Sequence, residues 1–296
     1  MKTAYLFPGQ GAQFSGMGKD LYGASAKARA LFAEANDILG FGLSDLMFKG
    51  SAKDLQQTHV TQPAVFVHSI VVASTSKNFR PDAVAGHSLG ELSAMVVAKA
   101  LSFRDGLKLV DARAKAMHEA CQAVPSTMLA VLSDEEKRIK DICQAICKTD
   151  ASHVVVPANY NARGQIVISG SNQGVTLAAK KLREAGIRRL IPLAVGGAFH
   201  SPLMEPAQKS LYKAIKKTLF KKPLCKVYQN VDAKATQDPE ILQKNLGKQL
   251  TAPVLWRQLI ENMVKDKYTT FGVCGPGNVL QGLMKKIAPE VKIIQL

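Results

Sequence analysis

Short apolar runs that lead directly into helical patterns dominate the first hundred residues. Residues 4–7 and 83–85 are strand candidates, and each run ends in a glycine-containing loop. Apolar positions then recur at helical spacing over 21–39 and 91–100. Strands that feed straight into helices are typical of a parallel sheet with helices on both faces. We therefore predict an α/β fold.

The pattern changes near the middle of the chain. Its apolar runs predict the order strand, helix, two strands, helix and strand, which is the ferredoxin-like order βαββαβ. We expect residues 124–191 to form an inserted ferredoxin-like subdomain. Residues 1–123 and 192–296 are expected to form a large α/β-hydrolase-like domain around the parallel sheet, with mostly helices in its C-terminal part.

The composition is that of a globular protein. The 296 residues are 47% apolar and 21% charged, with a mean hydropathy near zero, which excludes a disordered or fibrous chain. No window approaches the ~18 uninterrupted apolar residues of a membrane span, and Pro8 interrupts the N-terminal run, so we expect a cytoplasmic protein. The five scattered cysteines lack a zinc-knuckle spacing, which predicts reduced thiols and no metal.

The formal net charge of +16 implies attraction to an anionic partner. Nucleic acid, a phosphorylated small molecule, an acidic protein and a membrane surface all remain open on charge alone. No helix-turn-helix, aromatic-interleaved strand or zinc finger favours nucleic acid. The excess is concentrated between residues 206 and 231, where there are seven lysines and no acid.

Ser88 lies between Gly86 and Gly90 in a Gly-x-Ser-x-Gly motif at a predicted strand-to-helix junction. Flanking glycines permit the sharp turn of a nucleophile elbow, which presents the serine hydroxyl at a helix N-terminus. The helix dipole and free N–H groups there suit a developing oxyanion. The motif predicts a serine nucleophile, and the alternative is a serine that only caps the helix.

His200 is the candidate base for this serine. It lies in a loop between a strand and a helix, where catalytic side chains are common. By contrast, His87 belongs to the elbow itself, and His118 lies on the polar face of a predicted helix. The alternative for His200 is a surface histidine of the loop. No acid is an evident third member of the site.

Arg113 lies within the apolar stripe of the helix predicted over 104–121. The stripe consists of Leu109, Val110, Ala116, Met117 and Ala120. A buried guanidinium must find an anion or bear a large desolvation cost. Arg113 is therefore expected either to form a structural salt bridge with a core carboxylate or to bind a substrate carboxylate with two parallel hydrogen bonds.

The first glycine loop, residues 9–14, begins like the dinucleotide fingerprint Gly-x-Gly-x-x-Gly. Phe14 occupies the place of the third glycine, which makes a nucleotide site a poor interpretation. Two interpretations remain open. The loop either brings a backbone N–H next to the elbow or is simply a strand-to-helix turn.

Taken together, these motifs resemble the malonyl-coenzyme A:acyl carrier protein transacylase family, which includes the acyltransferase domains of fatty acid and polyketide synthases. The resemblance extends over essentially the whole chain, and the motifs occur in the order of the family. They are Phe7 to Gly11, Thr61 to Ala64, Gly86 to Glu91, Arg113, Asn159 to Asn161 with Gly164 and Gln165, Ala198 to Pro202, Gln249 with Pro253, Val254 and Trp256, and Gly275 to Gly277.

The resemblance implies a ping-pong transfer of malonyl from malonyl-coenzyme A to the phosphopantetheine thiol of an acyl carrier protein. Ser88 would be the nucleophile, and His200 would act first as general base and then as general acid. The backbone N–H groups of Gln10 and Leu89 would form the oxyanion hole. The family implies no cofactor, and its members are monomers by default.

Further site residues follow from the same resemblance. Arg113 would bind the malonyl carboxylate, with Gln62 and Asn161 as supporting polar groups. A backbone carbonyl near Gln249 would orient His200 in place of an acid. Phe199 would favour malonyl over methylmalonyl, because a bulky ring beside the acyl site leaves no room for a branch.

The helix predicted over 203–220 carries candidate docking residues for the acidic carrier protein. Its lysines fall on one face, opposite Leu211, Ile215 and Leu219, and are Lys209, Lys213, Lys216 and Lys217. A basic patch of this kind mainly raises the association rate with an acidic partner. The alternative is that these lysines only form the solvent-exposed face of the helix and bind no partner.

Two related enzymes compete with this interpretation. Acyl transfer by serine and histidine ends in hydrolysis whenever water reaches the acyl-enzyme before a thiol does, so a hydrolase that edits carrier-bound acyl groups is one alternative. Arg113 argues against it, because an editing enzyme needs no carboxylate clamp. A trans-acting acyltransferase of polyketide synthesis is the other alternative.

Overall fold

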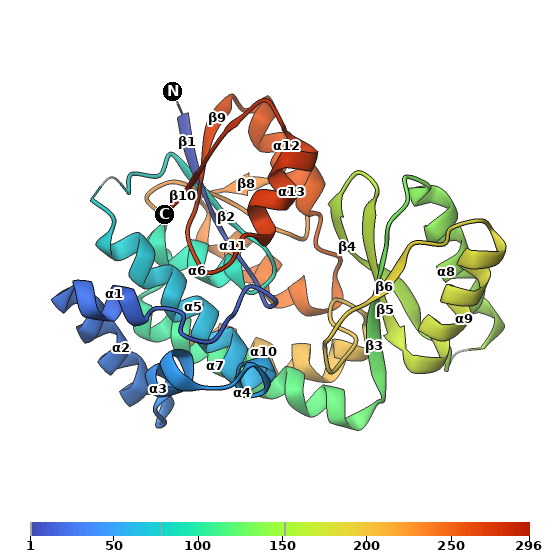
Figure 1. The fold of residues 1–296 in the computed structure, drawn as a ribbon, viewed down its shortest axis with the longest axis horizontal. Coiled ribbons are helices and arrows are strands. Elements are labelled where there is room, and N and C mark those ends of the chain that lie inside the picture. The colour runs from blue at the N-terminus through green and yellow to red at the C-terminus, as the bar shows by residue number, and fades with distance from the viewer. Residues whose placement is uncertain (1, 78, 151) are drawn as a thin grey trace.

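The computed structural model describes residues 2–77, 79–150 and 152–296, and these form two separate β-sheets, each with its own helices (Figure 1). The larger sheet has the strand order β10-β9-β1-β2-β7-β8. Strands β10, β9, β1, β2 and β7 run parallel, whereas β8 pairs antiparallel with β7. The predicted α/β fold with parallel strands is confirmed, and the antiparallel edge is an addition. The strands are β1 (Lys2–Phe7), β2 (Ala83–Gly86), β7 (Lys226–Tyr228), β8 (Ala235–Thr236), β9 (Tyr268–Val273) and β10 (Lys292–Gln295).

Helices surround the larger sheet. They are α1 (Lys19–Ala24), α2 (Ala26–Leu39), α3 (Leu43–Lys49), α4 (Ala52–Gln56), α5 (Thr58–Thr75), α6 (Gly90–Val97), α7 (Phe103–Ala123), α10 (Glu205–Lys217), α11 (Pro239–Lys248), α12 (Trp256–Lys265) and α13 (Val279–Ile287), with 3₁₀ turns η1 (Pro202–Met204) and η2 (Gln249–Thr251). The helical pattern over 21–39 is divided at Ser25, whose side chain accepts a hydrogen bond from the backbone N–H of Ala28 and so starts α2. No helix in the described ranges is long and apolar enough to cross a membrane.

Alternate residues of the central strands face two different hydrophobic cores. Tyr5 and Phe7 of β1 pack with α2, α5 and α7, whereas Ala4 and Leu6 pack with α12 and α13. Successive side chains of a strand point to opposite faces, so a sheet with helices on both sides needs apolar residues at every position. This explains why the strand candidates read as continuous apolar runs.

The smaller sheet has the strand order β4-β5-β3-β6, and its strand pairs are antiparallel. Its elements follow one another as β3 (Ser126–Val131), α8 (Glu136–Thr149), β4 (Val155–Ala162), β5 (Gln165–Ser171), α9 (Asn172–Glu184) and β6 (Leu190–Pro192). Apolar residues of α8 and α9 pack with the strands in a separate core. This sheet lies beside the larger domain (Figure 1).

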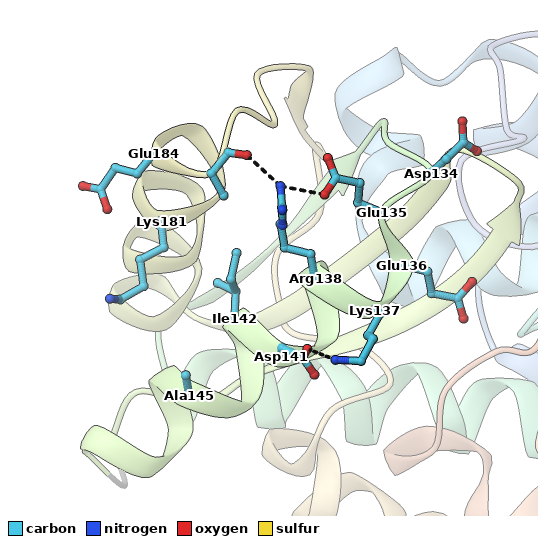
Figure 2. Close-up of a pocket in the computed structure, with 11 residues that line it drawn as sticks. Asp134, Glu135, Glu136, Lys137, Arg138, Asp141, Ile142, Ala145, Lys181 and Glu184 are labelled. Atoms are coloured by element: carbon cyan, nitrogen blue, oxygen red, sulfur yellow. Dashed lines mark hydrogen bonds and ion pairs between the residues drawn. The ribbon is translucent and has the colours of Figure 1, made fainter.

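The outer side of α8 and α9 carries a charged depression (Figure 2). Arg138 pairs there with Glu135 at 2.7 Å, and Lys137 pairs with Asp141 at 2.7 Å. These side chains are largely exposed, and exposed ion pairs contribute at most about 1 kcal/mol. The depression is a solvated helix surface that contains two exposed ion pairs.

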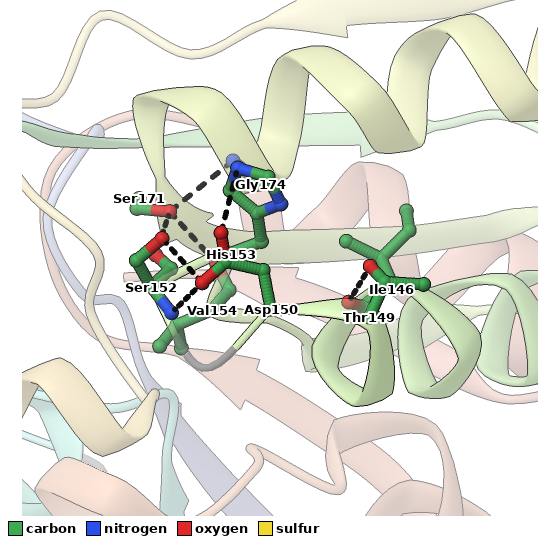
Figure 3. Close-up of polar contacts among 8 residues, drawn as sticks. All are labelled: Ile146, Thr149, Asp150, Ser152, His153, Val154, Ser171 and Gly174. Atoms are coloured by element: carbon green, nitrogen blue, oxygen red, sulfur yellow. Dashed lines mark hydrogen bonds and ion pairs between the residues drawn. The ribbon is translucent and has the colours of Figure 1, made fainter.

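The start of α9 is fixed by side-chain hydrogen bonds (Figure 3). Ser171 accepts a hydrogen bond from the backbone N–H of Gly174 at 3.1 Å and donates one to the carbonyl of Ser152 at 3.1 Å. The carboxylate of Asp150 in turn accepts from the N–H and hydroxyl of Ser152, both at 2.7 Å. These contacts join the α8–β4 turn to the N-terminus of α9.

Strand β4 attaches the smaller sheet to the large domain. The N–H of Val254 donates to the carbonyl of Ala158 at 2.8 Å, and the N–H of Tyr160 donates to the carbonyl of Val254 at 2.9 Å. An ion pair of 2.9 Å between Arg257 of α12 and Glu136 of α8 adds a second connection. Backbone hydrogen bonds therefore join β4 of the smaller sheet to the segment around Val254.

The C-terminal end of α10 differs from its prediction. Helix α10 ends at Lys217, because the backbone of Thr218 is extended (φ −96°, ψ 134°). Leu219 therefore lies outside the helix and is 68% exposed, whereas Leu211 and Ile215 are buried as predicted. The apolar face opposite the lysines is shorter than the sequence pattern suggested.

Candidate active site

A cavity of about 510 Å³ opens at the carboxyl ends of β1 and β2, next to the smaller sheet. Ligand sites of parallel sheets commonly lie at this edge. The cavity is lined by predicted residues from both domains, namely Gln10, Ser88, Leu89, Arg113, Asn161, Phe199 and His200. Gln62 and Gln249 lie behind this lining, where both contact Arg113.

Ser88 occupies a strained turn between β2 and α6. Its φ of 53° is in the left-handed region, which costs a non-glycine residue roughly 1–2 kcal/mol. The turn also requires both flanking glycines: a Cβ at Gly86 would lie 1.8 Å from the carbonyl carbon of Gly90, and one at Gly90 would lie 2.1 Å from the carbonyl oxygen of Phe7. The N-cap of α6 is Leu89, so Ser88 is not a helix cap. This geometry is that of a nucleophile elbow.

The hydroxyl of Ser88 contacts His200. The distance from Ser88 Oγ to His200 Nε2 is 2.7 Å, and the distance from His200 Nδ1 to the carbonyl oxygen of Gln249 is 2.9 Å. A carbonyl only accepts, so Nδ1 carries the proton and Nε2 is free to accept from the serine hydroxyl. His200 is 3% exposed and is therefore not a surface histidine.

His200 is held in its neutral form. Burial first and the positive charge of Arg113 second lower its pKa to about 3. A neutral imidazole at pH 7 can remove a proton from serine. The arrangement therefore provides a serine nucleophile and a base without an acid as third member.

Arg113 is buried beside the nucleophile without a carboxylate partner. It is 1% exposed and donates to Gln62 Oε1 at 2.7 Å, to Ser88 Oγ at 3.0 Å and to Gln249 Oε1 at 3.2 Å. Within the described ranges it forms no salt bridge, and its buried Nε lacks a hydrogen-bond partner. Burial lowers the pKa of Arg113 to about 10, so the guanidinium stays charged at neutral pH. The structural salt bridge considered from the sequence is not present.

Gln249 contacts Ser88, Arg113 and His200. Its backbone carbonyl accepts from His200, its side-chain oxygen accepts from Arg113, and its Nε2 donates to the carbonyl of Ser88 at 3.0 Å. Gln62 makes a related link from α5, because its Oε1 accepts from Arg113 while its Nε2 contacts the sulfur of Met117 at 3.3 Å. Two buried amides therefore fix the orientation of the guanidinium.

Asn230 is a site residue that sequence reasoning missed. Its Oδ1 accepts from the N–H of Ser88 at 2.7 Å, and its Nδ2 donates to the carbonyl of Gly86 at 2.7 Å. Asn230 follows β7, which is only three residues long and therefore gives almost no pattern in the sequence. The available signal is the apolar pair Val227-Tyr228 before two amides, since the carboxyl ends of parallel strands share one edge.

The remaining predicted residues lie around the cavity. Asn161 reaches from β4 to the elbow, where its Oδ1 is 2.9 Å from Nε2 of His87. Phe199 is buried next to His200. Gln10 and Leu89 line the cavity, and their backbone N–H groups have no protein acceptor among the described residues. Both groups are thus available to a developing oxyanion.

The four lysines predicted to dock a carrier protein lie elsewhere. They project from α10, which packs against α7, and they do not line the cavity. Lys209 pairs with Glu205 at 2.8 Å, and Lys216 lies 4.9 Å from the ring centre of Tyr212. Lys213 and Lys217 are exposed. The lysine patch of α10 therefore lies on the surface, outside the cavity that contains Ser88 and His200.

The neutral state of His200 can be measured directly. We expect long-range ¹H–¹⁵N NMR to show His200 as the Nδ1–H tautomer from pH 8 down to pH 5, because a lowered pKa keeps the ring neutral below its ordinary value of 6.5. The exposed His118 provides the comparison in the same spectrum. A titration of His200 with a midpoint near 6.5 would contradict this assignment.

Comparison with known proteins agrees with this geometry. The family described as acyl transferase domain matches residues 4–287. The malonyl CoA-acyl carrier protein transacylase of Bacillus subtilis is 41% identical over 295 residues, covering 99% of this chain and 92% of that protein. The solved transacylase of Coxiella burnetii has a TM-score of 0.95 at 33% identity, covering 100% of this chain and 94% of that one. A malonyl-transacylase solved in complex with a type II PKS acyl-carrier protein has a TM-score of 0.93 at 34% identity, covering 100% and 96% of the two chains. Since the matches include both sheets and every segment of the site, the chain belongs to the acyl transferase domain family.

Proposed function

We propose that this chain transfers a malonyl group from malonyl-coenzyme A to the phosphopantetheine thiol of an acyl carrier protein, through a seryl-acyl enzyme. The observation that carries the proposal is Arg113, a buried guanidinium 3.0 Å from the nucleophile that forms no ion pair with any carboxylate of the described residues. An acyl group that ends in a carboxylate fits this requirement. The names of the relatives support the same substrate and acceptor.

The first half-reaction acylates Ser88. Nε2 of His200 takes the hydroxyl proton as Oγ attacks the thioester carbonyl. The oxyanion faces the backbone N–H groups of Gln10 and Leu89. His200 then gives the proton to the departing thiolate of coenzyme A, and the malonyl ester of Ser88 remains.

The second half-reaction reverses the first with a different thiol. His200 takes the proton of the phosphopantetheine thiol, whose sulfur attacks the malonyl ester. Collapse of the tetrahedral intermediate returns the proton to Ser88 and releases the malonyl thioester. All proton transfers pass through the imidazole of His200, which alternates between its neutral and protonated forms, so the proposed reaction needs no cofactor.

The cavity also suits a malonyl group in its shape. Arg113 offers the two parallel N–H groups from which a carboxylate accepts hydrogen bonds. Phe199 fills space next to His200, which disfavours a branched methylmalonyl group.

Hydrolytic editing of carrier-bound acyl groups uses the same serine and histidine, but it leaves the charge of Arg113 without a role. The similarity to a type II PKS transacylase supports a place in either fatty acid or polyketide synthesis.

We also propose the finer organisation that the sequence suggested. The elbow after β2 supports an α/β-hydrolase-like large domain formed by residues 1–123 and 192–296. The strand order β4-β5-β3-β6 with two helices supports a ferredoxin-like subdomain over 124–191. The protein is proposed to act as a cytoplasmic monomer, and the free state of its cysteines supports a reducing compartment.

The acyl-enzyme can be detected by intact mass. We expect brief exposure to malonyl-coenzyme A to add one malonyl mass to the wild-type chain and none to Ser88→Ala, because Ser88 is the hydroxyl in contact with His200. Ser93→Ala, a change of another buried serine in α6, is the matched control and should retain the adduct. Labelling of Ser88→Ala would assign the nucleophile to another residue.

Removal of Arg113 should invert the acyl preference. Deleting one partner of a buried charge pair typically costs roughly 3–5 kcal/mol, so Arg113→Ala should lower malonyl transfer by about two to three and a half orders of magnitude. Acetyl transfer should be unchanged or faster, because an acetyl group offers no anion to the guanidinium. Initial rates with both thioesters measure this ratio, and Lys115→Ala on the exposed face of α7 is the control. A parallel loss of both rates and of thermal stability would instead assign Arg113 a structural role.

The lysines of α10 are proposed to attract the acidic carrier protein. Reversing the exposed Lys213 and Lys217 to glutamate should lower the transfer rate to the carrier protein by about tenfold at low salt, with a smaller effect at high salt. Transfer to a small thiol should not change. The same reversal at Lys140 and Lys148 of α8 controls for net charge. An equal loss with both acceptors would exclude docking through this patch.

A further inference from the structure

Glu91 is a buried carboxylate that the proposed mechanism does not use. It lies in the first turn of α6, three residues after the nucleophile, and has no exposed surface. Its Oε2 accepts from the backbone N–H of Asn230 at 2.7 Å, and its Oε1 accepts from Nε2 of Gln229 at 3.2 Å. Glu91 does not line the cavity, so any effect on the reaction must pass through its partners.

Those partners lead directly to the nucleophile. Asn230, whose backbone is held by Glu91, uses its side chain to join both arms of the elbow, at the carbonyl of Gly86 and the N–H of Ser88. The left-handed conformation of Ser88 persists only if its surroundings fix it. Glu91 is therefore hydrogen-bonded to Asn230, and Asn230 in turn holds the strained backbone of Ser88.

We propose that Glu91 is a positioning residue for the nucleophile, which acts by fixing Asn230 against the elbow. The inference rests on the proposed acyl transfer through Ser88. In this site the buried acid supports the serine, whereas a backbone carbonyl orients the base.

The ionised form of Glu91 suits this role. A carboxylate accepts at both oxygens, whereas a protonated acid would point its own hydrogen at one of the two N–H donors. Burial raises the pKa of Glu91 to about 7, and the hydrogen bonds from Asn230 and Gln229 oppose this rise. The charged groups acting on it are Asp232, beyond β7, and Arg113 of α7; the amide of Gln249 on η2 also faces it.

The direction of the pH effect follows from this raised pKa. The ionised form is lost as the pH falls through about 7, and the hold on Asn230 weakens with it. His200 does not titrate in this range, because its pKa is lowered. Wild-type acylation should therefore decline below pH 7 through Glu91 and not through the base.

The test compares Glu91→Gln with the wild type in two assays. One measures kcat and KM for malonyl transfer, and the other measures the labelling rate of Ser88 by a fluorophosphonate, which needs no malonyl group. A small displacement of reacting groups costs up to about 100-fold, so we expect kcat and the labelling rate to fall about 10- to 100-fold with KM unchanged. The decline below pH 7 should be absent from the variant. Ser93→Ala, two residues further along α6, should match the wild type.

Coupling to Asn230 separates positioning from a general loss of stability. Asn230→Ala should reproduce the loss of kcat, and the double variant should be no slower than the slower single variant. Multiplied losses in the double variant, a wild-type kcat in Glu91→Gln, or a change confined to KM would overturn the inference. If Glu91→Gln does not fold, Glu91→Asp, which keeps the charge but withdraws it by one methylene, must show the same loss of kcat.

Failure of the proposed function gives a different result. A wild-type protein that reacts with the fluorophosphonate but not with malonyl-coenzyme A would contradict malonyl transfer. The effect of Glu91→Gln on the fluorophosphonate rate would still decide whether Glu91 positions Ser88.

Discussion

A buried guanidinium that forms no ion pair within the described part of the chain is the constraint on which this site is built. Arg113 is surrounded by neutral acceptors from Gln62, Ser88 and Gln249, which solvate its charge but do not cancel it. Burial lowers the pKa of His200, and the charge of Arg113 adds to this lowering, so the imidazole stays neutral. An anionic acyl group at Arg113 would offset part of that effect and make His200 a stronger base once the substrate is bound. Substrate selection and base strength are thus linked through one residue.

The parallel sheet determines which segments can meet Arg113. Strands β1, β2 and β7 end at one edge, which brings the loop after β1, the elbow after β2 and Asn230 together although they are far apart in the sequence. The smaller sheet contributes Asn161 through β4, whose backbone is bonded to the segment around Val254. The site therefore depends on register within the large sheet as much as on any single side chain.

Residues with a local signal could be predicted from the sequence. Ser88 was identified by its flanking glycines, Arg113 by its place on an apolar stripe, and His200 by its loop, and the structure brings the three into contact. Gln62 and Gln249 were found only by family resemblance, because a buried amide looks like any other glutamine until its partners are known. The sequence shows almost no sign of Asn230, because β7 is too short to show an alternation of apolar and polar residues. Leu219 lies outside α10, contrary to its prediction, because the backbone becomes extended at Thr218.

The central inference is that Arg113 binds the carboxylate of the acyl group. A crystal structure of the malonyl ester of Ser88 tests it most directly. The account predicts that the guanidinium leaves Ser88 Oγ and makes two parallel hydrogen bonds to the malonyl carboxylate, while Gln62 and Gln249 keep their contacts with Arg113. A malonyl carboxylate directed into solvent, with Arg113 in its present contacts, would contradict it.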